Sequence, residues 1–279
     1  MITRQQALAL GAARLRTAGV PDAERDARLL YRWVSGAGAA TLSASLSDPA
    51  GAEERARFDQ AIEARCARKP VSHIIGKRAF WGRDFRVNRD VLDPRPETET
   101  LIARALEQPA ARILDLGTGS GCLLLTLLAE WPAATGIGVD VSGRALDMAL
   151  RNARNLGVED RAQLVRGSWY APVEGVFDLI IANPPYLSDQ EMGEISPELH
   201  HEPRLALSPG GDGLGAYRLI AADLFGYLAK NGRALFEIGT TQGPAVAKIL
   251  KAAGLSRVSI YPDMDGRDRV VGGLNATDC

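Results

Sequence analysis

The residues Asn183, Pro184, Pro185 and Tyr186 have the most distinctive chemistry in this chain, and they directly follow the apolar run 177–182. The run has the length and the Ile and Leu content of a buried strand, and the prolines end it because proline cannot donate to a sheet. Pro184 also keeps Asn183 out of the helical backbone region. The sequence therefore predicts a rigid corner at the carboxyl end of a strand.

This corner suits a reaction in which a planar, conjugated nitrogen attacks an electrophile. Such a nitrogen occurs in a carboxamide or in the exocyclic amine of a nucleobase. The side-chain oxygen of Asn183 and the carbonyl of Pro184 could accept its two hydrogens and turn its lone pair towards an electrophile. We expect Tyr186 to stack on the planar group. Asn183, Pro184 and Tyr186 are thus the candidate catalytic residues, and Pro185 joins them as a candidate substrate-binding residue. The alternative is a rigid turn with a surface tyrosine.

A second candidate site is the glycine-rich stretch Gly117, Thr118, Gly119, Ser120 and Gly121, which lies between a predicted strand and a predicted helix. Glycines let the chain turn sharply and let a ligand touch the backbone, while the free N–H groups of the helix face it. Asp140 follows about 20 residues later, where a carboxylate can hold ribose hydroxyls. The alternative for the glycines is a plain tight turn.

The elements that position these residues alternate between strand and helix from residue 112 onward. We predict strands at 112–116, 136–140, 163–165, 177–182, 233–238, 257–261 and 269–271, and helices at 96–107, 122–130, 142–155, 216–229 and 244–253. This order predicts an α/β fold with a doubly wound, mostly parallel seven-stranded sheet. Ligands bind such sheets outside the carboxyl ends of the strands, so the corner, the glycine stretch and Asp140 should share one site, beside a long polar loop at 187–215.

The glycine spacing identifies the ligand class. A dinucleotide fingerprint would need a third glycine at position 122 or 124, and these are Cys122 and Leu124. The stretch suits S-adenosylmethionine instead, which has no phosphate. Trp169 is placed to pack on its adenine, or else is a core aromatic. A donor site beside an amide-orienting corner predicts methyl transfer to nitrogen, with water taking the proton because the corner holds no general base.

The front of the chain reads as three helices in a docking or packing domain, residues 1–70. Thr3 and Gln6 predict a capping box, Asp22 is expected to cap a helix that ends near Gly36, and Asp48 to open a third. Strand-like pieces at 73–75, 79–81 and 85–87 predict a β-hairpin linker over 71–95, followed by the catalytic domain 96–279. Residues 1–95 carry a net charge of +6 and the remainder −7. This asymmetry hints that the front meets an anionic partner.

Whole-chain composition excludes several classes of protein. The 279 residues have a net charge of −1, which argues against direct nucleic-acid binding. The longest apolar stretch, 122–129, is too short to span a membrane, and the start of the chain does not look like a signal peptide. The cysteines Cys66, Cys122 and Cys279 fit neither a metal site nor a disulfide framework. We therefore expect a cytoplasmic protein without metal, and a monomer.

The sequence resembles, along nearly its whole length, the HemK/PrmC family of release-factor glutamine N5-methyltransferases. The matching stretches are 94–99 (PRPETE), 115–121 (DLGTGSG), 183–186 (NPPY), 202–207 (EPRLAL) with 211–214 (GDGL), 236–239 (FEIG) and 266–271 (GRDRVV). The combination of the first stretch with NPPY is specific, whereas many methyltransferases share the glycine stretch.

The resemblance implies that S-adenosylmethionine methylates the glutamine of the Gly-Gly-Gln loop in bacterial peptide-chain release factors. It implies that 117–121 and Asp140 bind the donor, that 183–186 seat the glutamine, and that the helical front holds the protein substrate. The family often has an acid before the tryptophan, where Ser168 is a weaker acceptor for the adenine amine. Asp93 and Thr240-Thr241 also depart from the pattern.

Three alternatives to this function stay open at this point. The first is methylation of a ribosomal-protein glutamine, which uses the same tetrapeptide. The second is methylation of a nucleic-acid amine, adenine N6 or guanine N2, which would call for a basic cleft that the acidic catalytic half does not offer. The third is a binding module with a vestigial donor site.

Overall fold

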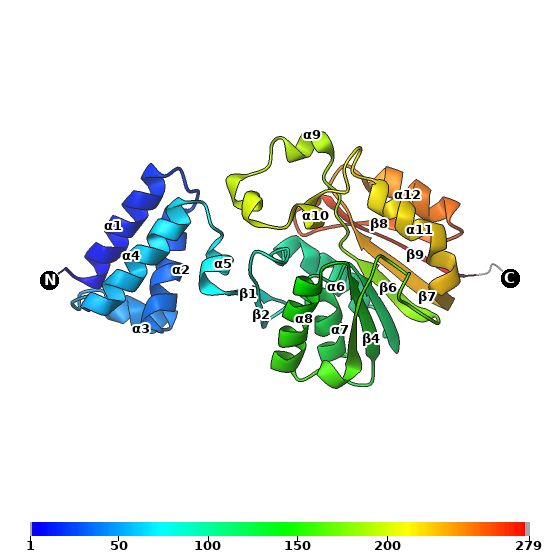
Figure 1. Cartoon of the computed structure of the whole chain (residues 1–279), viewed down its shortest axis with the longest axis horizontal. Coiled ribbons are helices and arrows are strands. Elements are labelled where there is room, and N and C mark those ends of the chain that lie inside the picture. The colour runs from blue at the N-terminus through cyan, green and yellow to red at the C-terminus, as the bar shows by residue number, and fades with distance from the viewer. Residues whose placement is uncertain (1, 277–279) are drawn as a thin grey trace. The chain divides into compact units, whose positions relative to one another are not determined.

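The computed structural model describes residues 2–276, and these residues divide into two compact units. The first unit holds the chain up to Lys77 together with the segment Ser196–His201, and the second holds Arg78–Ile195 and the chain from Glu202 onward. The first is a group of helices, whereas the second is a sheet covered by helices (Figure 1). Cys66 and Cys122 are free thiols, and Cys279 lies outside the described residues.

The first unit is built from short helices around an apolar core. The helices are α1 (Arg4–Thr17), α2 (Ala23–Ser35), α3 (Ala39–Ala44), α4 (Ala52–Cys66), α5 (Val71–Ile75) and the 3-10 helix η3 (Pro197–His201). Leu15, Leu30, Phe58 and Ile62 are at most 2% exposed and belong to this core. Helix α1 comes close to Phe58 at Gly11, where a Cβ atom would lie 2.7 Å from the ring. The apolar residues predicted at helical intervals therefore face one another.

One of the predicted helix starts is confirmed in detail. Thr3 Oγ1 accepts from the Gln6 backbone N–H at 3.2 Å, and Gln6 Oε1 accepts from the Thr3 N–H at 2.9 Å, which is the predicted capping box. Asp22 precedes α2 as expected, but its backbone is left-handed (φ 54°) and its side chain caps nothing. The predicted start of α4 at Asp48 is wrong, since the helix begins after Gly51.

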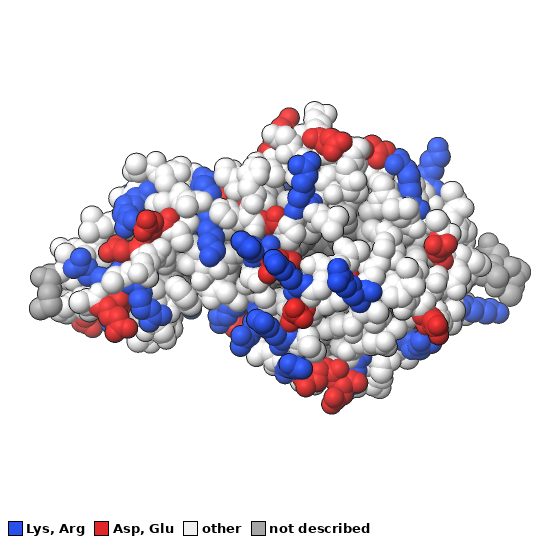
Figure 2. All heavy atoms as spheres, in the orientation of Figure 1, with Lys and Arg blue, Asp and Glu red and all other residues white. Residues whose placement is uncertain are grey.

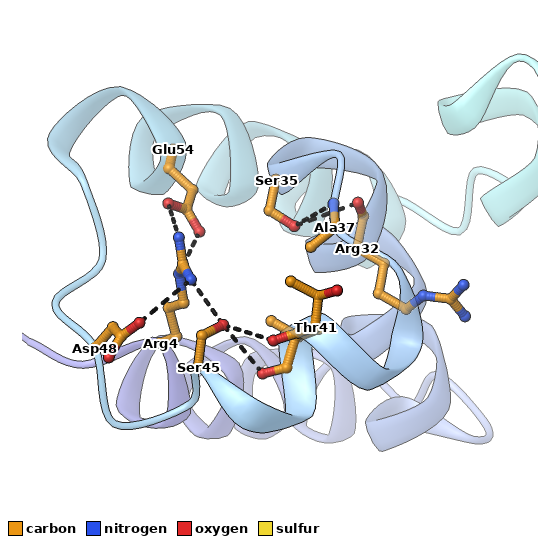
Figure 3. A network of polar contacts seen from close by, with 9 residues as sticks. Arg4, Arg32, Ser35, Ala37, Thr41, Ser45, Asp48 and Glu54 are labelled. Carbon is orange, nitrogen blue, oxygen red and sulfur yellow. Dashed lines mark hydrogen bonds and ion pairs between the residues drawn. The ribbon is translucent and has the colours of Figure 1, made fainter.

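A polar network joins three helical elements of the first unit (Figure 3). Arg4 on α1 pairs with Glu54 on α4 (Nε to Oε1, 3.2 Å) and donates to Ser45 Oγ at the end of α3 (2.8 Å). Ser45 in turn donates to the Thr41 carbonyl at 2.9 Å, and Asp48 lies 3.9 Å from the Arg4 guanidinium. Asp48 thus contributes to tertiary packing and not to a helix start.

Residues 73–75 are helical, and the prediction of a strand there is wrong. They belong to α5, which ends at Gly76 in the left-handed conformation (φ 80°). An apolar run this short has no decisive period, and its conformation follows from Ile74 and Ile75 packing against the core of the first unit. The hairpin itself is present as β1 (Lys77–Phe80) and β2 (Arg83–Arg86).

The second unit contains the predicted sheet. Its strands are β3 (Arg112–Leu116), β4 (Thr135–Asp140), β5 (Ala162–Arg166), β6 (Phe177–Ala182), β7 (Leu228–Glu237), β8 (Ser256–Pro262) and β9 (Asp268–Leu274). The seven strands lie in the order β5-β4-β3-β6-β7-β9-β8, and only β9 runs against the others. The fold class read from the sequence, a mostly parallel seven-stranded sheet with a helical front and a hairpin, is confirmed.

Helices cover both faces of this sheet, and a separate apolar core lies between the helices and each face. The helical elements are η1 (Pro96–Thr98), α6 (Glu99–Leu106), α7 (Cys122–Glu130), α8 (Gly143–Leu156), η2 (Glu159–Arg161), α11 (Gly215–Tyr227) and α12 (Gly243–Ala252). Helices α6, α7 and α8 contribute to one core, and α11 and α12 to the other, in agreement with their positions in Figure 1. The predicted loop 187–215 holds two short helices, α9 (Asp189–Met192) and α10 (Arg204–Leu207), besides η3.

Candidate active site

The strand order brings the predicted site segments together at one edge of the sheet. Strand β3 lies between β4 and β6, and all three are parallel. They end at Leu116, Asp140 and Ala182, so the glycine stretch, Asp140 and the proline corner leave the same edge. This edge is the point where the connections from β3 diverge, which is the usual ligand site of such a sheet.

The glycine stretch turns away from β3 through backbone conformations that favour glycine. Gly117 and Gly119 have φ angles of 78° and 56°. The N–H of Gly117 donates to the Val139 carbonyl at 2.8 Å, and the N–H of Gly119 donates to Asp140 Oδ2 at 2.9 Å. The loop then enters α7, whose first N–H groups have no partner within the helix and face the loop.

Asp140 holds the glycine stretch in place, and its carboxylate can also accept hydrogen bonds from a ligand. Its Oδ2 accepts from Gly119, and its Oδ1 accepts from the Ser142 N–H, both at 2.9 Å. Burial raises the pKa of Asp140, against the effect of these backbone N–H groups. Each carboxylate oxygen has a second lone pair, so two vicinal hydroxyls can still donate to Asp140.

A cavity of about 380 Å³ lies outside these strand ends. The predicted site residues that line it are Gly117, Thr118, Gly119, Ser120, Asp140, Ser168, Trp169, Asn183 and Pro185. Gly121, Pro184 and Tyr186 are not among its lining residues. Trp169 is held in a left-handed conformation (φ 48°), which costs energy for a bulky residue and fixes its direction. The glycine stretch and Asn183 therefore face the same cavity.

Gly121 contributes to packing rather than to the cavity wall. It has a φ angle of 81°, and a Cβ atom there would lie 2.6 Å from Leu125 Cδ1 and 3.3 Å from Ala149 Cβ. The residue thus allows α7 and α8 to approach each other behind the loop.

Hydrogen bonds to its backbone hold the proline corner in place. The N–H groups of Tyr186 and Leu187 both donate to the Leu207 carbonyl, at 3.2 and 3.0 Å. Gln242 Nε2 donates to the Tyr186 carbonyl at 2.9 Å. The Tyr186 ring packs partly buried against an apolar core, and burial raises the pKa of its phenol.

Several apolar residues that the sequence did not predict as site residues also line the cavity. They are Leu92, Pro203, Leu205, Ala206, Pro209 and Leu219. Leu205 and Leu219 are 62% and 60% exposed, although they line the cavity. Most of them lie in or near the loop 187–215, whose polar composition gave no sign that the chain folds back over the strand ends.

Arg95 links the segment before α6 to this loop. Its guanidinium lies 2.6 Å from Glu202 Oε1 and 3.8 Å from Asp93 Oδ2. Glu202 also accepts from the Asp93 backbone N–H at 3.3 Å, and both carboxyl groups are buried. Arg95 and Glu97 do not line the cavity, whereas Pro94 and Thr98 of the same PRPETE stretch do. The stretch thus combines an ion pair with a part of the cavity wall.

The segment Ser196–His201 of the same loop belongs to the first unit, where two arginines hold it. One arginine lies in α4 and the other just after it. Glu198 Oε1 lies 2.9 Å from Arg65 Nη1 and 2.7 Å from Arg68 Nη2. Although partial burial would raise the pKa of Glu198, the Arg68 and Arg65 guanidiniums lower it to about 2. Arg65 is itself buried and pairs with Asp26 at 2.8 Å.

Residues 2–276 contain no group of three or more His, Cys, Asp or Glu side chains placed to hold a metal ion. In the same part of the chain, every helix is too short or too polar to cross a bilayer.

Two family models match the sequence, the PrmC N-terminal domain over residues 6–76 and the methyltransferase small domain over residues 91–219. A release factor glutamine methyltransferase of Cereibacter sphaeroides is 53% identical, and the match covers 95% of this chain and 96% of that relative. The chain belongs to the release factor glutamine methyltransferase family. The family protein of Rhodospirillum rubrum is 44% identical over 93% of this chain and 81% of its own length.

The resemblance read from the motifs is thus confirmed, and the family fold is shared more widely. The solved structure of the hMettl16 catalytic domain in complex with MAT2A 3′UTR hairpin 6 superposes with a TM-score of 0.61, over 78% of this chain and 83% of that chain. The sequence identity is 14%, so this similarity concerns the fold alone.

Proposed function

We propose that this protein transfers a methyl group from S-adenosylmethionine to the side-chain amide nitrogen of the glutamine in the Gly-Gly-Gln loop of peptide-chain release factors. The observation that supports this most is the shared cavity: Asn183 faces the space that the glycine stretch and Asp140 also line. Relatives that match nearly the full chain are named release factor glutamine methyltransferases.

The residues of the cavity fit the donor. The N–H groups of Gly117, Thr118 and Gly119 are already bonded to Val139 and Asp140, so the loop offers backbone carbonyl oxygens to the amino group of the donor. Asp140 offers acceptor oxygens to its ribose hydroxyls, and Ser168 and Trp169 offer a hydroxyl and a flat face to its adenine. When bound there, the donor supplies an electrophilic methyl group on a sulfonium sulfur.

The corner would bind and turn the glutamine amide. Asn183 Oδ1 and the Pro184 carbonyl accept its N–H hydrogens, which rotates the nitrogen lone pair towards the cavity and weakens its conjugation with the carbonyl. Because the nitrogen gains positive charge as it takes the methyl group, its N–H groups become stronger donors, and these hydrogen bonds stabilise the transition state more than the ground state. Tyr186 would contact the substrate only through its partly exposed edge.

The chain's own thiol in the cavity does not compete for the methyl group. Cys122 lines the cavity, but burial raises the pKa of its thiol to about 12. The thiolate, which is the nucleophilic form, is therefore scarce at neutral pH. Cys122 is a packing residue in this account.

We further propose that the first unit holds the release factor, as the match to the PrmC N-terminal domain over residues 6–76 suggests. The face drawn in Figure 2 gives little support to a nucleic-acid substrate, because Asp and Glu side chains lie among its Lys and Arg side chains. A phosphate backbone is usually bound along a basic strip.

Parallel methylation assays test the proposal. The protein is incubated with isotope-labelled S-adenosylmethionine and, separately, with release factor, ribosomal protein and RNA, and mass spectrometry locates the labelled methyl group. We expect label on the glutamine amide of the release factor. Label confined to ribosomal protein or RNA would overturn the substrate assignment, and failure to bind the donor would overturn the enzymatic function.

A further inference from the structure

Two buried polar residues, Thr98 and Glu237, lie close to Asn183. Thr98 ends η1, is 2% exposed and lines the cavity, and Glu237 ends β7 and is 1% exposed. Asn183 Nδ2 donates to Thr98 Oγ1 at 3.4 Å, and the Thr98 hydroxyl lies beside Glu237, whose pKa it lowers by hydrogen bonding. The three side chains lie at the ends of η1, β6 and β7 in the second unit and can form one chain of hydrogen bonds.

The direction of these hydrogen bonds follows from the chemistry of the groups. An ionised carboxylate can only accept, so the single hydroxyl hydrogen of Thr98 must go to Glu237. The Thr98 oxygen then has only lone pairs to offer to Asn183. The amide of Asn183 must therefore turn its NH2 group to Thr98, which leaves its oxygen on the other side.

We propose that Thr98 and Glu237 are positioning residues that fix the side-chain amide of Asn183 with its oxygen towards the substrate nitrogen. This inference rests on the proposed methylation of an amide. In the opposite orientation, Asn183 would present N–H hydrogens to the N–H hydrogens of the substrate, and the corner would repel the group that it must bind. The long 3.4 Å contact is of the kind that tightens when a substrate binds.

A purely structural role does not account for Glu237. Its Oε2 atom is buried without a hydrogen-bond partner among the described residues. The Tyr217 hydroxyl donates at 2.8 Å to the backbone carbonyl of Glu237 and not to its carboxyl group. Because an incompletely satisfied buried carboxyl group lowers stability, an apolar or amide side chain would serve packing better.

The surroundings of Glu237 make the orientation of Asn183 pH-dependent. Burial raises the pKa of Glu237 to about 7, against the hydrogen bond from Thr98 and the positive charges of Arg269 and Arg95. Its other titratable neighbours are Glu97, Tyr186, Tyr217 and Cys122.

Protonation reverses the chain of hydrogen bonds. Below this pKa, Glu237 can donate to Thr98, and the Thr98 hydrogen becomes free to bond the oxygen of Asn183. The Asn183 amide then turns over. We therefore expect turnover to fall as the pH drops through about 7.

Three threonine variants test the hydrogen-bond chain. Thr98→Val removes the hydroxyl at nearly constant volume, and Thr98→Ser keeps it. Thr126→Val makes the same change at a threonine of α7 that is 0% exposed and whose hydroxyl has no hydrogen-bond partner among residues 2–276. All are compared with the wild type in kcat and KM on release factor, in donor affinity and in Tm.

We expect Thr98→Val to lower kcat about tenfold, which is the loss of one aligned hydrogen bond, with little change in KM or donor affinity. Thr98→Ser should restore most of the activity, and Thr126→Val should match the wild type. An unchanged kcat in folded Thr98→Val, or an equal loss in Thr126→Val, would overturn the inference.

The pH profile tests Glu237 separately. Glu237→Gln removes the titration, so its kcat should be lower than that of the wild type above pH 7 and nearly independent of pH below it. Asp115 is also buried, and burial raises its pKa to about 7, so the variant decides which acid causes the decline. A decline that persists in Glu237→Gln would contradict the inference, whereas a wild type that methylates no amide at all would contradict the proposed function.

Discussion

Asn183 would perform the chemistry through a single atom, its side-chain oxygen. The residue lies in a rigid corner because two prolines follow it, and its NH2 group is engaged by Thr98. The sequence predicted the corner because all of its determinants are local. It did not predict Thr98, which lies 85 positions away and meets Asn183 only through the packing of η1 against the strand ends.

At this scale, Asn183→Ala separates catalysis from donor binding. Loss of one preorganised acceptor should lower kcat roughly 100-fold, while affinity for S-adenosylhomocysteine should change little. Steady-state assays and calorimetric titration measure the two quantities. An equal loss of both would assign Asn183 to donor binding rather than to the substrate amide.

A substitution at Asp140 should affect donor binding, as the one at Asn183 should affect catalysis. Asp140→Asn should weaken donor binding about tenfold, because hydrogen bonds to a charged acceptor are stronger than those to an amide. Asp178→Asn is the matched control, since Asp178 accepts the N–H groups of Ala111 and Arg112 at the opposite end of the sheet. Calorimetry should show unchanged donor affinity in the control, and equal weakening in both variants would speak against the ribose role of Asp140.

For elements whose ends are marked by nearby glycine or proline residues, the sequence predicted the first and last residues correctly. Strand β3, helix α7 and strand β6 have their expected bounds, because glycine or proline residues flank mostly apolar runs. Strand β7 begins five positions earlier than the predicted 233, since its first half, Leu-Ala-Lys-Asn-Gly, has the composition of a turn. The strand forms there because Leu228 pairs with Phe177 of β6, and no local sequence pattern predicts this contact.

The approach of α7 to α8 gives a prediction at the same scale. Gly121→Ala combines a left-handed backbone with a Cβ atom 2.6 Å from Leu125 Cδ1. We expect a loss of roughly 2–4 kcal/mol in the free energy of unfolding, from backbone strain and overpacking together. Gly143→Ala, at the start of α8, meets no atom within 4 Å and should cost almost nothing. Equal denaturation midpoints for the two variants would contradict the packing role of Gly121.

Across the whole molecule, the loop 187–215 is the part whose structure is least evident from the sequence. It leaves and re-enters the second unit, and its segment Ser196–His201 belongs to the first unit. The anchor there is Glu198 between Arg65 and Arg68. Long polar loops give no sequence pattern for such an anchor, because it depends on single charges meeting in the folded chain.

The ion pairs of Glu198 make the first unit sensitive to acid. The pKa of Glu198 is lowered to about 2, so its contribution to stability is full above its ordinary value of 4.5 and is lost as the pH falls towards 2. Glu198→Gln should therefore lower stability at neutral pH and reduce the difference between neutral and acidic stability. Thermal unfolding followed from pH 7 to about pH 3 measures this. An unchanged pH dependence in the variant would contradict the anchor.

A crystal structure with S-adenosylhomocysteine bound tests the central claim most directly. The account predicts the amino-acid end of the ligand on residues 117–120, its ribose on Asp140, and its sulfur atom facing the side-chain oxygen of Asn183. A ligand whose sulfur points away from Asn183, or an Asn183 amide turned with its NH2 group into the cavity, would contradict it.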